Sequence, residues 1–463
     1  MSYVLLPISM FIKQMNNSSF LFLTELPIYI YISIIMMFLL IGKFPKPKYL
    51  FNKRIIVCLL IILFMQFIAM FLSNYEIGNA ITNRNPLKEY VRLLLFFGCI
   101  IIHYVVVRIS VKNQVSMIRF IQGNGVALII LLIVTYLQFF YLIFPHIFTN
   151  TVSFIGKYFE NRYDRSWYSQ GSYVQTLHRI NGFNPESDYL AIQFLVVFVP
   201  FLLSAIKNKF NIFFPKSTYN PTLYYLTLLG VIIILFFAQT TTGILAILLI
   251  VGFLWLSLPI KRKLLTAVSF LILFIILCIV VTNNAYMMEI LNENLFNKAE
   301  SDSSMNRIGG TIGLIVTWFK HFIFGVGWNF HNYYLLKNVP QWTTNNGEYM
   351  YVFSAQNFYP ILSVFFGWLA EFGTIIVIFL VVYIYKLLSD FRKFSKQVNL
   401  ITNNEFEYKF IKTISDSVHF FVIFYLISSL FVFYWSESVY LIMFFFFIVV
   451  RQYLKKEYGT NDN

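Results

Sequence analysis

The chain has 463 residues, of which 59% are hydrophobic, 20% are aromatic and only 12% are charged, and its formal net charge is +15. The basic residues are dispersed as short groups between apolar segments, which argues against a nucleic-acid-binding face. Apolar segments of roughly 17 to 25 residues recur along the chain, each long enough to cross a bilayer as a helix. Because these segments lack the alternating pattern of a membrane β-barrel, the sequence predicts an all-α polytopic integral membrane protein.

In chain order the apolar segments predict eleven membrane spans. Two further features, at the N-terminus and near 358–385, leave a count of twelve open. Tyr3–Ile12 is apolar but too short to span, and 358–385 is long enough to be a partial helix followed by a full one. No repeat and no low-complexity linker divides the chain, so residues 1–463 are predicted to form a single integral membrane domain. The predicted spans are 20–42, 55–73, 90–107, 121–144, 189–206, 223–238, 243–258, 264–281, 358–385, 418–434 and 438–450.

Positive charge orients these spans. A basic segment, KFPKPKYLFNKR, follows the first span, and every second connection after it is also basic. The positive-inside rule assigns these connections to the cytoplasm. The same alternation puts two long connections, 145–188 and 282–357, outside the cytoplasm. Both are rich in Tyr, Asn, Ser and Trp, which predicts folded caps over the helix bundle that form the active site.

The stretch HRINGFNPESDYLA, residues 178–191, gathers polar chemistry where the first outer loop returns to the membrane. Pro185 is expected near the start of a helix, with Glu186 and Asp188 in its first turn, where the helix dipole favours carboxylates. Arg179 would lie at the membrane surface. Local chemistry leaves two interpretations open: the arginine anchors the span to phospholipid headgroups, or it binds a substrate.

Taken with later stretches, these residues resemble the O-antigen polymerase and O-antigen ligase superfamily, the Wzy-type enzymes of bacterial surface polysaccharide assembly. In members of this superfamily, an arginine in an outer loop is followed by a glycine and then by a segment that contains proline or an acidic residue and begins a membrane span. The resemblance covers roughly residues 90–450, and the polymerase branch is favoured. The matching elements, in order, are Arg179, Gly182, Pro185, Glu186 and Ala191; FFAQTTTGILAILL at 236–249; 303–330, which closes on Gly325 and Gly327; 356–373, which ends in Glu371 and Gly373; and a C-terminal two-helix hairpin.

The resemblance implies a GT-C-like glycosyltransferase in the bacterial cytoplasmic membrane, with an active site that faces the periplasm or the cell exterior. Its reaction would polymerise undecaprenyl-pyrophosphate-linked oligosaccharide repeat units into O-antigen, capsule or exopolysaccharide. The implied partners are this lipid-linked oligosaccharide, membrane lipids and, as a candidate, a chain-length regulator protein. No cofactor and no nucleic acid are implied.

Two arginines are predicted to bind the pyrophosphate, because guanidinium groups hold phosphate oxygens with two hydrogen bonds each. Arg179 and Arg307 both lie outside by the charge pattern and both lie where a loop meets a helix. Glu186 and His178, the acid–base residues nearest to Arg179 in sequence, are the predicted catalytic partners, and the wider set of candidate bases includes Asp188, His331, Glu348 and Glu371. The predicted substrate-binding residues are Asp188, Arg162, Arg165, Lys320, Gln356, Asn357 and Glu371.

Aromatic residues of the two outer loops are expected either to stack on sugar rings or to form loop cores and membrane-interface anchors. These residues are Tyr163, Trp167, Tyr168, Tyr173, Trp328, Tyr333, Tyr334, Trp342 and Tyr349. The predicted spans are nearly free of ionisable residues, the two halves of the chain do not match, and polar residues gather in two loops on the same side of the membrane. This favours surface chemistry over the alternative of a lipid-linked-sugar flippase or transporter.

Three further features bear on the assignment. Ligases of the superfamily typically carry a His-Asn pair where this chain has Gln356-Asn357, which argues against the other alternative, an O-antigen ligase or protein O-oligosaccharyltransferase. Gly243 stands where the family turn often has an arginine, so no third arginine is expected there. No spaced set of His, Cys and Asp residues has the character of metal ligands, so no metal is predicted.

Overall fold

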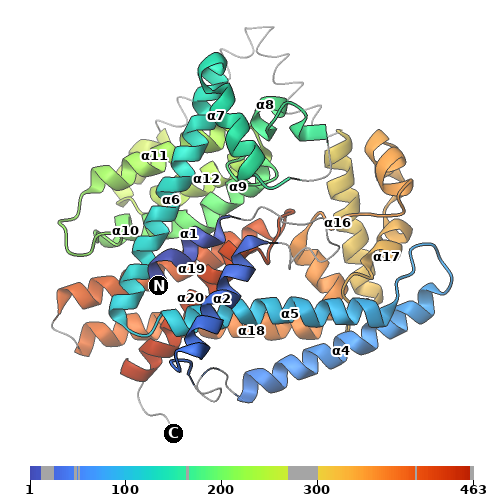
Figure 1. Ribbon diagram of the computed structural model, residues 1–463, viewed down its shortest axis with the longest axis horizontal. Coiled ribbons are helices and arrows are strands. Elements are labelled where there is room, and N and C mark those ends of the chain that lie inside the picture. The colour runs from blue at the N-terminus through green and yellow to red at the C-terminus, as the bar shows by residue number, and fades with distance from the viewer. Residues whose placement is uncertain are drawn as a thin grey trace.

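The computed structural model describes residues 1–11, 25–45, 50, 53–162, 166–268, 301–401 and 404–458. Every element of regular structure in these ranges is a helix, packed as a bundle with a smaller set of helices at one end (Figure 1). Seven of the described helices are long and apolar enough to cross a membrane. The chain is therefore a polytopic α-helical membrane protein, as the composition predicts.

These seven candidate spans match predicted segments, and three shorter apolar helices match three more. The predicted span 264–281 lies mostly outside the described residues. The seven candidate spans are α4 (Lys53–Ile77), α5 (Pro86–Ser110), α6 (Gln114–Ile143), the composite helix Ser187–Asn208, α18 (Val364–Ile401, of which the candidate span ends at Val398), α19 (Glu405–Ser428) and α20 (Ser438–Tyr458). The three shorter apolar helices are α2 (Leu26–Leu40), α11 (Pro221–Phe237) and α12 (Thr241–Leu256).

The remaining helices are short or lie outside the predicted spans. They are η1 (Ser2–Val4), α1 (Leu5–Ser9), α7 (Pro145–Tyr158), η3 (Ser166–Tyr168), α8 (Tyr173–Leu177), α16 (Asp302–Lys320), α17 (His331–Asn338), η6 (Gln341–Thr343) and η7 (Tyr349–Ser354). Leu5 and Leu6 are fully buried, so the N-terminal apolar segment packs into the bundle as a short helix. Most of α16 falls within 303–330, one of the stretches that resemble the family, and the helix runs across the direction of α5 and α18 (Figure 1).

The composite helix Ser187–Asn208 forms the centre of the bundle. It consists of α9 (Ser187–Gln193), a π-helical turn (Phe194–Phe198) and α10 (Val199–Asn208). Pro200 has no N–H to donate to the preceding turn, which accounts for the π-helical turn directly before it. In the apolar stretch of 18 residues within this helix, 94% is buried inside the protein. Its first residues, Ser187 and Asp188, are consequently held by protein on most sides.

The largest boundary errors fall on two of the predicted spans. The helix predicted at 418–434 begins at Glu405 in the structure. Asn404 caps this helix, because its side chain accepts from the N–H groups of Phe406 and Glu407. The predicted span 358–385 runs from Val364 to Ile401. Both helices continue into polar sequence that hydropathy does not detect. Gly373 (φ 74°, ψ 170°) interrupts α18, so a partial helix does precede a full one there.

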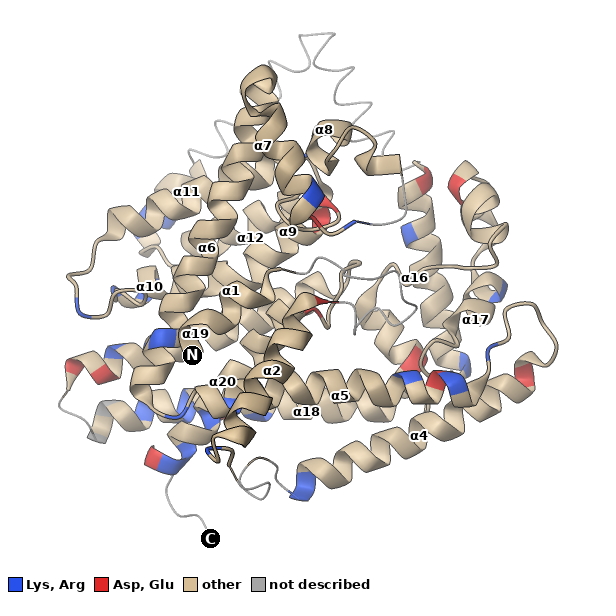
Figure 2. Ribbon diagram, in the orientation of Figure 1, with Lys and Arg blue, Asp and Glu red and all other residues tan. Residues whose placement is uncertain are grey.

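The basic residues of the predicted cytoplasmic connections lie away from the end of the bundle that holds α16 and α17. The basic residues at the start of α4, at the end of α20 and between α10 and α11 lie to the left of α16 and α17 (Figure 2). α5 links the two ends, since Arg84 precedes its first turn and Arg108 lies in its last turn. The helices α16 and α17 therefore lie at the end opposite to the predicted cytoplasmic connections.

Candidate functional site

A cavity of about 1080 Å³ opens at the end of the bundle that holds α16 and α17. Its lining comes from connections that the charge pattern assigns to the outer side: α4–α5, 159–186, α11–α12, 301–363 and α19–α20, together with the adjoining helix ends. Small-molecule pockets usually have volumes of roughly 300 to 1000 Å³. This cavity is therefore large enough for a ligand of oligosaccharide size.

The cavity brings together five of the predicted site residues. Arg179, Glu186, Asp188, Arg307 and Glu371 all line it, although they come from segments up to 192 residues apart in the sequence. His331 and Glu348, from the wider set of candidate bases, line it as well.

The remaining predicted residues that the structure describes do not line the cavity. His178 is an exposed C-cap residue of α8 with φ 55°. Lys320 is exposed and its Nζ donates to Asn338 Oδ1 at 2.7 Å, and Gln356 and Asn357 lie on an exposed turn. Arg162 stabilises its own loop through Glu160, the Gly171 carbonyl oxygen and the Tyr168 ring. Arg165 and Tyr163 lie outside the described residues.

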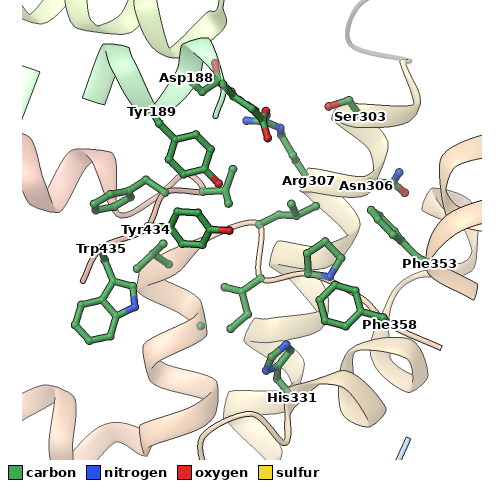
Figure 3. A pocket seen from close by; sticks show the side chains of 18 of the residues that line it. Asp188, Tyr189, Ser303, Asn306, Arg307, His331, Phe353, Phe358, Tyr434 and Trp435 are labelled. Carbon is green, nitrogen blue, oxygen red and sulfur yellow. Dashed lines mark hydrogen bonds and ion pairs between the residues drawn. The ribbon is translucent and has the colours of Figure 1, made fainter. Parts of the chain in front are cut away.

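Arg307 meets Asp188 at one end of the cavity. The Nη2 atom of Arg307, on the second turn of α16, lies 3.2 Å from Oδ2 of Asp188, on the first turn of α9. Oδ1 of Asp188 is buried and has no hydrogen-bond partner among the described residues. The pair joins two helices that are 119 residues apart in sequence. Figure 3 shows both side chains at the same edge of the cavity.

A buried polar network fixes the segment that carries Arg179. Asn181 Nδ2 donates to Glu160 Oε1 and to the Asn184 carbonyl oxygen, each at 2.6 Å. Gln138 of α6 accepts from the Gly182 N–H at 2.8 Å, and the positive φ of Gly182 (62°) permits this tight turn. The helix begins at Ser187, so Asp188 lies in its first turn as predicted, whereas Glu186 is the N-cap residue just before that turn. The backbone next to Arg179, an exposed residue that lines the cavity, is thereby held in place.

Glu160 should make the stability of this network depend on pH. Burial raises its pKa from 4.5 to about 7, against the opposing effects of Asn181, the Tyr173 N–H and Arg162. The folded protein then binds this proton more tightly than the unfolded chain does. The contribution of Glu160 to stability should therefore be fully present below about pH 4.5 and fall by up to roughly 3 kcal/mol as the pH rises to about 7.

The thermal unfolding midpoint in detergent, followed across this pH range, measures the effect. Glu160→Gln should flatten the pH dependence, whereas Glu457→Gln, at an exposed position, should leave it unchanged. Equal pH dependence in the wild type and in Glu160→Gln would contradict the expectation.

Two glycine turns form the other side of the cavity. The N–H groups of Val326 and Gly327 donate to the carbonyl oxygens of Ala370 and Glu371, at 2.8 and 3.0 Å. A Cβ atom on Gly325 would lie 2.5 Å from the Glu371 carbonyl oxygen, and one on Gly373 would lie 2.3 Å from the Ile323 carbonyl oxygen. The Gly-Val-Gly and Glu-Phe-Gly stretches noted in the sequence are thus one packed unit.

This unit presents Glu371 and His331 to the cavity. Oε1 of Glu371 lies 2.7 Å from His331 Nδ1 and accepts from the Asn329 N–H at 2.8 Å. Asn329 Nδ2 donates to Glu89 Oε2 at 3.0 Å, and Glu89 is 2.5 Å from Nη1 of Arg92. A continuous set of polar contacts therefore joins α18 to α5 at the base of the cavity.

Aromatic side chains form much of the remaining wall. The Tyr189 and Tyr434 rings stack with centroids 5.2 Å apart, and Phe96 contacts both Trp328 and Trp435. Figure 3 shows Tyr189, Tyr434 and Trp435 across the cavity from Phe353 and Phe358. Of the loop aromatics singled out in the sequence, Trp167, Tyr173 and Trp328 line the cavity.

Comparison of the chain with protein-family models, with curated proteins and with solved structures gave no match. In the described ranges, no group of three or more His, Cys, Asp or Glu residues is arranged to hold a metal ion.

Sequence reasoning missed several cavity residues. Arg84 and Arg92 flank the start of α5, and Trp435 lies in the short turn between α19 and α20. One signal was available for the arginines: Arg84, Lys88 and Arg92 lie at an end of a span that the charge pattern assigns to the outer side, where basic residues are disfavoured. No local signal distinguished Trp435 from the other interfacial aromatics.

Proposed function

We propose that the protein is a GT-C-like glycosyltransferase that polymerises undecaprenyl-pyrophosphate-linked oligosaccharide repeat units on the outer side of the bacterial cytoplasmic membrane. The observation that carries the proposal is the convergence of Arg179 and Arg307 with an aromatic wall in one cavity of about 1080 Å³. The resemblance of the ordered sequence elements to Wzy-type polymerases supports the same proposal.

Each part of the cavity fits a part of this reaction. The departing pyrophosphate carries several negative charges, which the guanidinium groups of Arg179 and Arg307 would stabilise as they develop. The aromatic wall suits the C–H faces of sugar rings. A cavity at one end of the bundle would let the polyprenyl chain stay in the bilayer while its headgroup enters.

The acceptor hydroxyl must lose a proton, and we assign this proton to Glu186. Asp188 is in contact with Arg307, so its role is to orient that arginine. Glu186 lines the cavity, is half-buried and lies close to Arg179 in sequence. His178, which does not line the cavity, is not retained as a base in this proposal.

The test is a gene deletion complemented with wild-type protein or with Glu186→Gln, which keeps the size of the side chain but cannot accept the proton. Gel analysis of the surface glycan should show long polymer with the wild type and single repeat units with both the deletion and the variant. Polymer left on the lipid carrier in the deletion would indicate a ligase, and repeat units trapped in the cytoplasm would indicate a flippase. Either result would overturn the proposal.

A further inference from the structure

Arg84 is a cavity residue whose guanidinium is fixed by buried side chains. It precedes α5, and its side chain is 30% exposed. With the Asn332 amide oriented to satisfy its neighbours, Oδ1 of Asn332 accepts from Nη2 of Arg84 at 3.0 Å and Nδ2 donates to His331 Nε2 at 3.1 Å. His331 in turn contacts Glu371 at 2.7 Å. Glu371, His331 and Asn332 therefore act as positioning residues for Arg84.

The charge of Arg84 is only weakly neutralised. Among the described residues, the one carboxylate within 4.0 Å of Arg84 is that of Glu89, and it lies at that limit. The same Glu89 oxygen is 2.5 Å from Arg92, and its other oxygen accepts from Asn329. Glu371 is separated from Arg84 by His331 and Asn332. A fixed guanidinium with donors facing a cavity is well suited to hold a phosphate.

Arg84 lies at a different end of the cavity from the predicted pyrophosphate clamp. Its anchor, Asn332, follows His331 directly, and Figure 3 shows His331 across the cavity from Arg307 and Asp188. The Tyr434 ring lies between these ends, and Phe358 lies beside His331. The cavity thus has two cationic ends separated by surfaces suited to sugars.

We propose that Arg84 binds a second phosphate headgroup, that of the acceptor substrate, so that the cavity holds two lipid-linked pyrophosphates at once. This inference rests on the proposed polymerase function. In the reaction, the bond between the donor sugar C1 and its pyrophosphate breaks, and a bond from C1 to the acceptor hydroxyl oxygen forms. The hydroxyl proton passes to Glu186 and undecaprenyl pyrophosphate leaves with the bonding electrons. The acceptor keeps its own pyrophosphate, which Arg84 holds throughout.

The number of bound lipids tests this assignment. Full-length protein in detergent is titrated with undecaprenyl pyrophosphate, and native mass spectrometry counts the bound molecules. We expect two per wild-type chain, one in Arg84→Ala and one in Arg307→Ala, with the lost site weakened roughly 10- to 100-fold. Asn332→Asp, which puts a carboxylate against Arg84 at nearly constant volume, should also lose one site.

Lys88→Ala is the matched control, because it removes an exposed positive charge from the same turn of the chain and should keep both sites. Two sites retained in both Arg84→Ala and Asn332→Asp would overturn the role of Arg84. A single wild-type site that is removed by Arg307→Ala would overturn the second site but leave the proposed function standing. No binding by the wild type would instead count against the proposed function itself.

Discussion

Replacing Arg307 with alanine should reduce chain lengthening by roughly 100- to 1000-fold, the effect typical of removing one preorganised donor to a developing negative charge. Arg307 lines the cavity, and Asp188 at 3.2 Å holds its guanidinium in place. The loss should appear in the turnover of lipid-linked repeat units by protein in liposomes, measured as the length of the glycan ladder. Single repeat units on the lipid carrier should stay intact.

Two further variants separate charge from geometry at this position. Arg307→Lys keeps the positive charge but not the fork of donors, so it should recover only part of the activity. Lys337→Ala removes an exposed charge on the neighbouring helix α17 and should retain full activity. Normal polymer length from correctly inserted Arg307→Ala protein would contradict a pyrophosphate-binding role.

Replacing Gly373 with alanine should destabilise the protein more than any other glycine-to-alanine change in α18. Its backbone conformation (φ 74°, ψ 170°) is almost restricted to glycine and costs about 1 to 3 kcal/mol for other residues. The new Cβ would also lie 2.3 Å from the Ile323 carbonyl oxygen, which forces the two packed turns apart. The thermal unfolding midpoint in detergent should fall, and the yield of folded protein should fall with it.

Gly98→Ala in α5 provides the comparison for this substitution. A Cβ atom at Gly98 meets no atom within 4 Å, and the residue lies inside a regular helix. Alanine there should be neutral or stabilising by up to about 1 kcal/mol. If Gly373→Ala and Gly98→Ala unfold at the same temperature, the packing of the two glycine turns does not limit stability.

Most of the helical architecture could be predicted from the sequence, since long apolar segments in a bilayer have few alternatives to helices. The errors fall where the helices leave the apolar region. α19 begins at Glu405 because Asn404 caps it, and the polar residues that follow carry no hydropathy signal. The break in α18 was detectable as an excess of length, but the docking of Gly373 against Gly325 depends on a contact between distant segments.

The candidate site was predictable only in part. Arg179 and Arg307 were selected from their positions at loop–helix junctions, and Glu186 from its closeness to Arg179 in the sequence; all three line the cavity. Arg162 is an arginine of the same predicted loop as Arg179, yet it contacts Glu160 and Tyr168 and does not line the cavity.

The sequence by itself determined the class of protein, the approximate spans and the side of the bundle on which polar residues gather, because these depend on local composition and on charge between spans. The tertiary structure alone decided which arginines share a cavity, why Arg84 is fixed by Asn332, and which aromatic residues form the wall. These relations join segments tens to hundreds of residues apart. They follow from how the helices pack, which no local pattern encodes.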